Sequence, residues 1–377
     1  MDEARLLLIP GPVTVEEEVR EALSRPVPAH YGPAWTATYR RLQERLARLF
    51  GTEGRVFLLF GPGSAGIEMG FASMLARGDE VVIASNGSFG ERLIAVAEAV
   101  GLTVHPLRVK GHEPVQRAAV EAALRAHPDA RAFAVVHTET SIGLRNPIEE
   151  LCPVAREHGV LTLVDAVASL GGVEVQMDAW GIDLCVSVVN KALAAPIGIA
   201  PVAVGPRAWA AVDDGRAKAA GWYLNLATWR SYDKGWESWH PHPTTMPSSV
   251  VEALEVATER IERIGIAEYV ARQARASARV RQGLRELGFS LLAPDGYAAP
   301  VVTAAWVPEG MDVEDYQTWL ATEHGMRIGG GLGDLEGRIF RVGHMGHAAD
   351  PDVVDRYLRA TGEYVERTGL APRARAG

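Results

Sequence analysis

The sequence predicts an α/β fold in which a large, doubly wound, mostly parallel sheet of seven strands is followed by a smaller C-terminal α+β domain. Between about residues 52 and 205, short and continuously apolar runs alternate with amphipathic segments. Runs of this kind are typical of parallel strands that helices cover on both faces. The length of 377 residues, 47% of them hydrophobic, is enough for two domains.

The elements of the large domain can be assigned in chain order. A first helix, at 35–51, has apolar spacing near 3.6 residues and stops at Gly51. The seven predicted strands of the sheet are 55–60, 80–85, 102–107, 132–137, 160–165, 184–189 and 199–204. Amphipathic helices are predicted between several of them, at 64–76, 89–100, 114–126 and 147–158. Ligands of such a sheet are expected at the carboxyl ends of its strands.

The rest of the chain is less regular. Residues 206–247 hold five of the nine tryptophans and show little periodicity, so we expect a long ordered excursion. A helical stretch at 248–287, broken near Gly265, then leads into the smaller domain. Its predicted strands are 289–293, 301–307, 327–333 and 338–344, and its helices are 312–324 and 350–367. The expected organisation is an N-terminal segment (1–20) that joins the site to the small domain, a large domain (21–260) and a small domain (261–377).

The composition of the chain limits the kinds of molecule that it is expected to bind. The net charge is -9, from 38 basic and 47 acidic residues, and nothing supplies the basic surface that nucleic acid or an anionic membrane requires. Only two cysteines occur, Cys152 and Cys185, which indicates neither a disulfide framework nor a thiolate metal site. No apolar stretch approaches the roughly 20 residues of a membrane span, and the start of the chain lacks the pattern of a signal peptide. We therefore expect a cytoplasmic protein with small-molecule ligands.

Two apolar runs each deliver one charged residue where the run stops. Asp165 ends the strand in "LVDAVASLGG", and Lys191 follows the strand in "SVVNKALAAPIG". A strand-end aspartate is often only a cap for the next helix, and most lysines are solvated. Small and apolar neighbours, however, destabilise an ammonium group and lower its pKa. The pair suggests an amine that forms a Schiff base and an acid that pairs with a heterocyclic cation, the two groups that pyridoxal phosphate needs.

That cofactor also requires a phosphate site and a cover for its ring. The stretch "LLFGPGSAGIEMG" reads as strand, glycine turn and helix, so the turn around Gly63 and Ser64 can present backbone amides to an anion, although glycine often serves turn geometry alone. Phe89 in "SNGSFGER" is either a core aromatic or a ring that stacks on the pyridine face. "HTETSIGL" at 137–144 places hydroxyls and an acid directly after another strand.

These motifs, together with "PGPV" near the start and "RVGHMG" near the end, resemble the class V pyridoxal-phosphate aminotransferases. The likeness runs in order from about residue 6 to 365 and is strongest to the alanine:glyoxylate and serine:pyruvate branch. It implies the fold type I architecture and transfer of an amino group from a small amino acid to a 2-oxo acid such as glyoxylate or pyruvate by a ping-pong mechanism. It also implies a homodimer with shared active sites.

The resemblance assigns a role to each matching position. Lys191 matches the lysine that carries the cofactor and moves the substrate proton, and Asp165 matches the partner of the pyridinium nitrogen. Arg341 matches the arginine that binds the substrate carboxylate, which suits a planar guanidinium, and backbone around Gly11 lines the same pocket. The remaining matches concern the cofactor: Gly63, Ser64, Asn190, His242 and Thr245 near the phosphate, Phe89 on the ring, and Thr140 near the phenolic oxygen.

Two of these positions depart from the family pattern. Asn190 stands where a glutamine is common and reaches less far, and His242 stands where a tyrosine is frequent, which leaves its phosphate contact open. Thr245 matches a threonine that reaches the phosphate of the neighbouring subunit. A metal site at His240 and His242 is disfavoured by the adjacent prolines and the lack of a nearby acid pair, so no metal is expected.

Other functions remain as alternatives. A transaminase that acts on pyridoxamine and pyruvate shares most of these motifs, whereas a desulfurase needs a reactive cysteine on a C-terminal loop, and both cysteines precede Lys191. A nicotinamide-dependent dehydrogenase is disfavoured because "GPGSAG" lacks the full glycine fingerprint and the strand "VVIAS" ends without an acid. A non-catalytic binding module is the last alternative.

Overall fold

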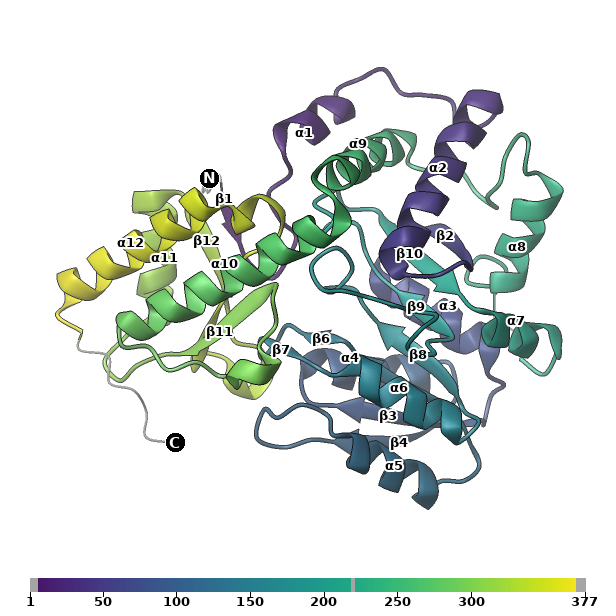
Figure 1. Cartoon of the computed structure of the whole chain (residues 1–377), viewed down its shortest axis with the longest axis horizontal. Helices are drawn as coiled ribbons and strands as arrows, with labels where there is room; N and C mark the ends of the chain where they lie inside the picture. The colour runs from purple at the N-terminus through teal and green to yellow at the C-terminus, as the bar shows by residue number, and fades with distance from the viewer. Residues whose placement is uncertain (1–5, 218–220, 371–377) are drawn as a thin grey trace.

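The computed structural model describes residues 6–217 and 221–370, and it confirms the predicted two-sheet architecture (Figure 1). The large sheet has seven strands in the order β2-β10-β9-β8-β5-β3-β4. β10 is antiparallel to both β2 and β9, and all other neighbouring pairs are parallel. Its strands are β2 (Arg55–Phe60), β3 (Glu80–Ser85), β4 (Thr103–Arg108), β5 (Ala130–Val136), β8 (Leu161–Asp165), β9 (Leu184–Val186) and β10 (Ile199–Val204).

Helices cover both faces of this sheet, as right-handed crossovers between parallel strands require. The helix α3 packs beside α4, and α5 packs beside α6 on the opposite face. The helix α2 packs on β2 and β10, and α9 packs against α2. Their bounds are α2 (Pro33–Phe50), α3 (Gly63–Met74), α4 (Ser88–Ala99), α5 (Arg117–Ala126), α6 (Ile148–Glu157) and α9 (Ser248–Ile264).

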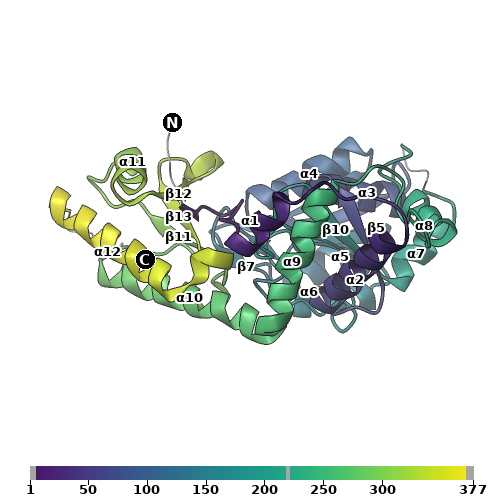
Figure 2. The same ribbon diagram turned by 90° about the horizontal axis from the view of Figure 1, so that it is seen from above.

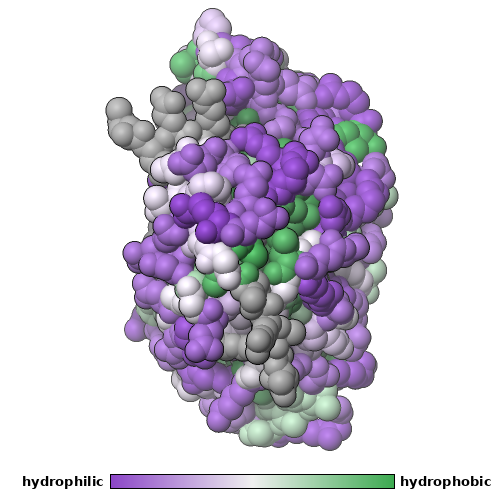
Figure 3. Space-filling view, turned by 90° about the vertical axis from the view of Figure 1, so that its left-hand side faces the viewer, coloured by the Kyte–Doolittle hydropathy of each residue, from purple (hydrophilic) through white to green (hydrophobic). Residues whose placement is uncertain are grey.

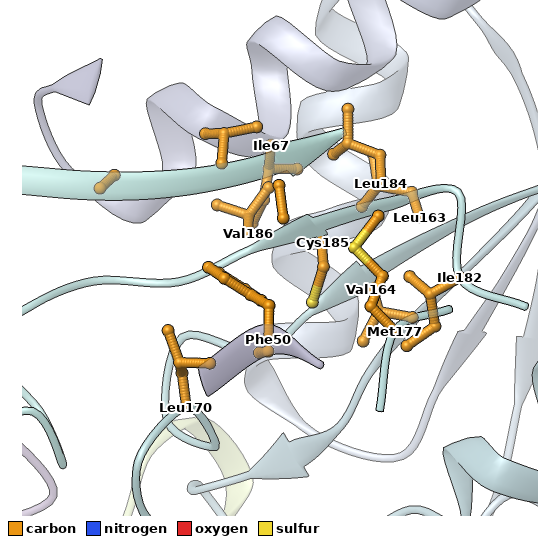
Figure 4. Close-up of a cluster of buried hydrophobic side chains, with 14 of the residues drawn as sticks. Phe50, Ile67, Leu163, Val164, Leu170, Met177, Ile182, Leu184, Cys185 and Val186 are labelled. Carbon is orange, nitrogen blue, oxygen red and sulfur yellow. The ribbon is translucent and has the colours of Figure 1, made fainter. Parts of the chain in front are cut away.

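Three glycines bring the helix α3 unusually close to the sheet. A Cβ atom at Gly63, Gly66 or Gly70 would lie 2.6 to 2.8 Å from a side chain of the sheet or of the loop after it. Figure 4 shows the result: Ile67 of α3 lies over Leu184 and Val186, while Cys185 and Phe50 pack on the other side of the same strands. Side chains that alternate along β8 and β9 thus fill the core on both faces of the sheet. The close packing also fixes the start of α3 at the edge of the sheet.

The smaller domain is built around a four-stranded sheet in the order β1-β12-β13-β11. Its first strand, β1 (Leu6–Leu8), comes from the N-terminus and pairs in parallel with β12 (Met326–Gly330), while β11 (Val302–Trp306) and β13 (Ile339–Gly343) are antiparallel partners. The helices α10 (Ile266–Glu286) and α11 (Val313–His324) pack on this sheet, and α12 (Pro351–Thr368) packs against both helices. Seen from above, this domain lies to one side of the large one, with α10 leading from one to the other (Figure 2).

The structure differs from the sequence-based expectations in several places. The predicted strand at 289–293 forms only an isolated bridge, between Leu291 and Ala305. The segment 206–247, expected to lack periodic structure, contains α7 (Pro206–Asp213) and α8 (Leu226–Gly235), within the part of it that the structure describes. Three short elements were also missed: the strand β1 (Leu6–Leu8), the helix α1 (Glu17–Leu23), and the hairpin of β6 (Thr138–Glu139) and β7 (Leu144–Arg145). Helices of seven to ten residues carry little periodicity to detect.

The end of the molecule formed by the small domain is mostly hydrophilic around a central hydrophobic patch (Figure 3). It lies at the side of the molecule opposite α8 (Figure 1). Among the helices in the described ranges, none combines the length and apolar character that crossing a membrane would require.

Candidate active site

Most of the residues predicted for the site follow strands of the large sheet at one edge. Asp165 is the last residue of β8 and lies beside Val136 of β5 and Val186 of β9. Phe89 lies in the first turn of α4, directly after β3, and Thr140 follows β6. Because β3, β5, β8 and β9 are parallel, these residues and the loop that carries Lys191 meet at the carboxyl edge, where ligands of such sheets bind.

The amine of Lys191 is held by the N-terminal segment. Its Nζ donates a hydrogen bond to the carbonyl oxygen of Pro10 at 2.7 Å, and it lies 5.7 Å from the centre of the Phe89 ring. A Cβ atom at Gly11 would come within 3.0 Å of the lysine's Cδ and Cε, so the bare backbone there makes room for the side chain. The residue after the lysine is also held in place, because the hydroxyl of Tyr269 donates a hydrogen bond to the carbonyl oxygen of Ala192 at 2.7 Å.

Burial lowers the pKa of Lys191 to about 8, although the nearby carboxylate of Asp165 acts in the opposite direction. The guanidinium of Arg341 contributes to the lowering. An amine with such a pKa is partly unprotonated near neutral pH, which is what a nucleophile or general base requires. The alternative interpretation, that Lys191 is an ordinary solvated lysine, does not fit this environment.

The lowered pKa predicts the pH dependence of Lys191 reactivity. Because only the neutral amine attacks a carbonyl, the reaction of Lys191 with a small aromatic aldehyde should accelerate as pH rises and level off above about pH 9. Borohydride trapping followed by peptide mass spectrometry measures this rate at Lys191 and at the exposed Lys110 in the same sample. A midpoint near 8 at Lys191 is expected, and a midpoint shared with Lys110 would contradict the assignment.

Asp165 is only 6% exposed, and burial raises its pKa to about 6. The backbone amide of Val167 donates to its Oδ1 at 2.9 Å and, with the charge of Lys191, opposes that rise. Asp165 does not cap a helix, because the residues after it form a turn. A buried carboxylate with one backbone donor retains acceptor capacity for a cationic N–H group.

The predicted anion site falls at the first turn of α3. Its N-cap is Pro62, which makes no side-chain capping bond, so the first amides of the helix point outward beside Gly63 and the half-buried Ser64. The side chain of Val167 lies against Gly63 at the distance where a Cβ would clash. The amide turn, the lysine loop and the loop after β8 therefore share one edge of the sheet.

Arg341 reaches this edge from the small domain. It lies in β13, is 7% exposed, and donates from Nε to the carbonyl oxygen of Gly330 at 2.7 Å and from Nη1 to that of Thr140 at 3.1 Å. Its Nη2 lies 3.6 Å from the position a Cβ would take at Gly329, where Pro10 also packs. The site is therefore formed by both domains and the N-terminal segment.

Three predicted cofactor contacts fall at the margin of this arrangement. Asn190 is half-buried, and its carbonyl oxygen accepts from the amide of Val13 at 3.3 Å. Thr245 is exposed in the single chain. His242 is fully buried: Trp35 Nε1 donates to its Nε2 at 2.8 Å, and its Nδ1 lies 2.7 Å from the carbonyl oxygen of Thr244.

Both ring nitrogens of His242 are thus engaged within the chain, and burial lowers its pKa to about 3. The imidazole is a neutral group within the core and offers no free nitrogen to a phosphate. The predicted phosphate contact of His242 stays a prediction that the geometry of the chain does not favour.

Outside this edge, two groups of side chains in the described ranges have the composition of metal ligands. Glu80, His105 and His127 lie together, but the two imidazole rings stack on each other at 3.6 Å and 14°, and Nε2 of His105 already lies 2.8 Å from Oε2 of Glu80. In the group of Glu16, His347 and Asp350, Arg260 and Arg272 already pair with the carboxylates. Neither arrangement supports a metal assignment.

Comparison with known proteins identifies the family of the chain. The Aminotransferase class-V family matches residues 24–333, and the chain belongs to that family. An uncharacterized aminotransferase of Methanocaldococcus jannaschii is 34% identical over 97% of this chain and 96% of its own length. The crystal structure of an alanine–glyoxylate aminotransferase from Nostoc sp. has a TM-score of 0.91 at 33% identity and covers 97% of this chain and 95% of its own.

A third relative bears on the choice of substrate. The crystal structure of pyridoxamine–pyruvate aminotransferase from Mesorhizobium loti has a TM-score of 0.90 at 28% identity, with 97% of this chain and 93% of its own covered. The protein described here is therefore an aminotransferase with the fold type I architecture. Enzymes of the family depend on pyridoxal phosphate in general.

Proposed function

We propose that the chain uses pyridoxal 5'-phosphate to move the amino group of a small amino acid, of the alanine or serine type, to a 2-oxo acid such as glyoxylate or pyruvate. The observation that carries the proposal is the meeting of three charged groups, the buried Asp165 and Arg341 and the half-buried Lys191, at one edge of the large sheet. Relatives named for glyoxylate and for pyruvate support the acceptor class.

The residues present fit this cofactor. The bare backbone at Gly11 leaves space along the lysine stem, the amide turn at Gly63 suits a phosphate, and the Phe89 ring faces the amine. Asp165 is a buried acceptor at the same edge. When bound there, pyridoxal phosphate would supply an electron sink for the charge that develops at the substrate's α-carbon.

Each group of the chain then has a defined task. Lys191 would carry the cofactor. Once released, its amine would take a proton from the substrate's α-carbon and return it to another atom. A pKa of about 8 suits an amine that both accepts and donates a proton. Asp165 would keep the ring nitrogen protonated through its negative charge, and Phe89 would cover the ring face and exclude water. Donor and acceptor would occupy the same site in turn, which gives ping-pong kinetics.

Arg341 would bind the carboxylate that amino acid and oxo acid share. Its guanidinium is held by two backbone carbonyls, from Gly330 and Thr140, so its plane is fixed before substrate arrives. Burial lowers the pKa of Arg341, although the nearby Glu139 opposes this, and a partly desolvated cation binds an anion more strongly than a hydrated one.

Two rival activities can be compared with the structure. In a desulfurase a cysteine thiolate would attack, but Cys152 and Cys185 are both buried, and burial raises the pKa of each thiol. A transaminase acting on free pyridoxamine has no need of a phosphate site, and the amide turn at Gly63 supports the phosphorylated cofactor instead.

The deciding experiment is mass spectrometry of the ligand that copurifies with the protein, followed by a screen of amino donors against glyoxylate and pyruvate. Pyridoxal or pyridoxamine phosphate, with turnover of a small amino acid, is expected. Turnover of unphosphorylated pyridoxamine with pyruvate, and none with amino acids, would replace this proposal by its rival.

We further propose a homodimer with shared active sites. Four exposed aromatic side chains, here called the aromatic patch, gather around α8: Tyr31 (49% exposed), Trp222 (56%), Trp236 (48%) and Trp239 (48%). The rings of Tyr31 and Trp236 each lie 5.5 Å from that of Trp239. An exposed cluster of this kind is typical of an interface core, and the exposed Thr245 lies a few residues further on.

Replacing Trp236 by glutamate should therefore weaken the dimer, because a carboxylate would be buried without a partner. Light scattering is expected to show twice the mass of one chain for the wild type and for the control Arg117→Glu on the exposed α5, and single chains for W236E at low micromolar concentration. The affinity for pyridoxal phosphate should fall together with the dimer. A fully active wild-type monomer would exclude shared sites.

A further inference from the structure

A buried acid next to the site has no role in the mechanism so far. Glu139, at the end of β6, is completely buried, and both of its carboxylate oxygens accept hydrogen bonds. Its Oε2 accepts from the backbone amides of Phe89 and Gly90, each at 3.0 Å, and its Oε1 accepts from the amide and the hydroxyl of Ser141 at 3.1 and 2.5 Å.

The contacts to Phe89 and Gly90 make Glu139 the cap of a helix that lies 50 residues away in sequence. The N-cap of α4 is Gly87, which has no side chain to satisfy the first amides of the helix. A Cβ atom at Gly87 would lie 2.5 Å from Cγ of Glu139, so the glycine leaves the space that the glutamate fills. A carboxylate at a helix N-terminus is stabilised by the amides and by the helix dipole.

The same residue also fixes the substrate side of the site. Thr140 follows Glu139 directly, and its carbonyl oxygen accepts from Nη1 of Arg341 at 3.1 Å. The hydroxyl of Ser141, which donates to Glu139, accepts in turn from the amide of Ser88 in the first turn of α4. The segment 139–141 is therefore bonded on one side to the helix that carries Phe89 and on the other to Arg341.

Capping of the helix α4 explains some of these hydrogen bonds. It does not explain why Glu139 lies between two functional side chains that come from different domains. All four groups that contact the carboxylate are donors, so a neutral amide in its place would set an NH₂ group against one pair of them. Burial raises the pKa of Glu139, and the four donors oppose that rise. When ionised, its carboxylate adds a second negative charge that acts on Lys191 and Arg341.

We propose that Glu139 is a positioning residue that holds Phe89 and Arg341 in one rigid frame, so that the surface covering the cofactor ring and the group binding the substrate carboxylate are set together. The inference rests on the proposed function for the roles of Phe89 and Arg341. Its geometric content, the joint placement of these two side chains, concerns this chain alone.

The test compares Glu139→Gln with Glu149→Gln. Glu149 belongs to the next helix, α6, pairs with Arg145 of β7, and is not among the residues assigned to the site. Three quantities are measured: the dissociation constant of pyridoxal phosphate from the apoenzyme, the KM for the oxo acid, and the melting temperature of the apoenzyme. For E139Q we expect both constants to rise together, each by about 10- to 100-fold, as loss of hydrogen bonds to a charged group implies. For E149Q all three should stay close to wild type.

Two further variants guard against misfolding of E139Q. Glu139→Asp keeps the charge and should recover part of both constants, whereas Ser141→Ala removes one donor and should raise both by a smaller factor. Crystal structures of cofactor-free wild-type and E139Q proteins supply a readout without activity, in which Phe89 and Arg341 are expected to be displaced together. Unchanged positions and constants in E139Q, or unchanged constants in S141A where E139Q does not fold, would overturn the inference.

Failure of the inference is distinguishable from failure of the proposed function. If the wild-type protein binds no pyridoxal phosphate, the function is wrong whatever E139Q does, and the two crystal structures alone decide on the positioning role. If wild type transaminates and E139Q matches E149Q in every constant, the function stands and the role of Glu139 is wrong.

Discussion

Lys191→Ala is expected to lower transaminase turnover by at least about 10³-fold, because no other group replaces an amine that both carries the cofactor and moves the proton. The visible absorbance of the cofactor joined to the protein should disappear, while pyridoxal phosphate can still bind reversibly through the phosphate site. Absorbance titration and stopped-flow assays with the donor found in the screen measure both effects.

The matched control for this variant is Lys110→Ala, which removes an exposed lysine outside the site. It should retain full turnover and the visible absorbance. Circular dichroism would show whether the K191A protein is folded. Turnover of a folded K191A protein within tenfold of wild type would remove Lys191 from the mechanism, and with it the proposed function.

Asp165→Asn is expected to reduce turnover by about 10²- to 10³-fold, the usual effect of removing one preorganised electrostatic group. The substitution keeps the shape of the side chain and an oxygen that accepts from the amide of Val167, so the loop after β8 should be preserved. What is lost is the charge that keeps the cofactor's ring nitrogen protonated. Steady-state kinetics should show the effect in kcat more than in KM.

The stability of the same variant should change in the opposite direction. Since burial raises the pKa of Asp165 to about 6 in the folded chain, above its value in the unfolded chain, the cofactor-free fold loses stability as pH rises through that range. At pH 8 the D165N apoenzyme should therefore melt at the same temperature as wild type or higher. Lower activity with a clearly lower melting temperature would indicate a structural lesion instead.

The sequence was most informative where local pattern and tertiary role coincide. The strands at 55–60, 80–85 and 199–204 were predicted with their observed bounds, because continuous apolar runs between turn residues leave little freedom of assignment. Asp165 and Lys191 were recognisable for the same reason, since each is a charged residue at the end of such a run. Their chemical roles stay predictions until the variants above are measured.

What the sequence could not show depends on contacts between distant segments. The motif at 137–144 revealed an acid, but the amides that Glu139 caps belong to a helix 50 residues earlier. The buried state of His242 depends on Trp35, 207 residues away, which no local pattern around "HPHP" could reveal. The predicted strand at 289–293 failed because an apolar run alone does not supply a strand partner along its length.

The N-terminal segment links the nucleophile to the small domain in a mechanical sense. Three residues of it form β1 in the small sheet, and two residues later the carbonyl oxygen of Pro10 accepts the hydrogen bond from Lys191. If the small sheet moved away from the large one, the N-terminal segment would move with it. The hydrogen bond between Lys191 and Pro10 would then lengthen. Such a motion would therefore couple separation of the two domains to release of the amine from Pro10.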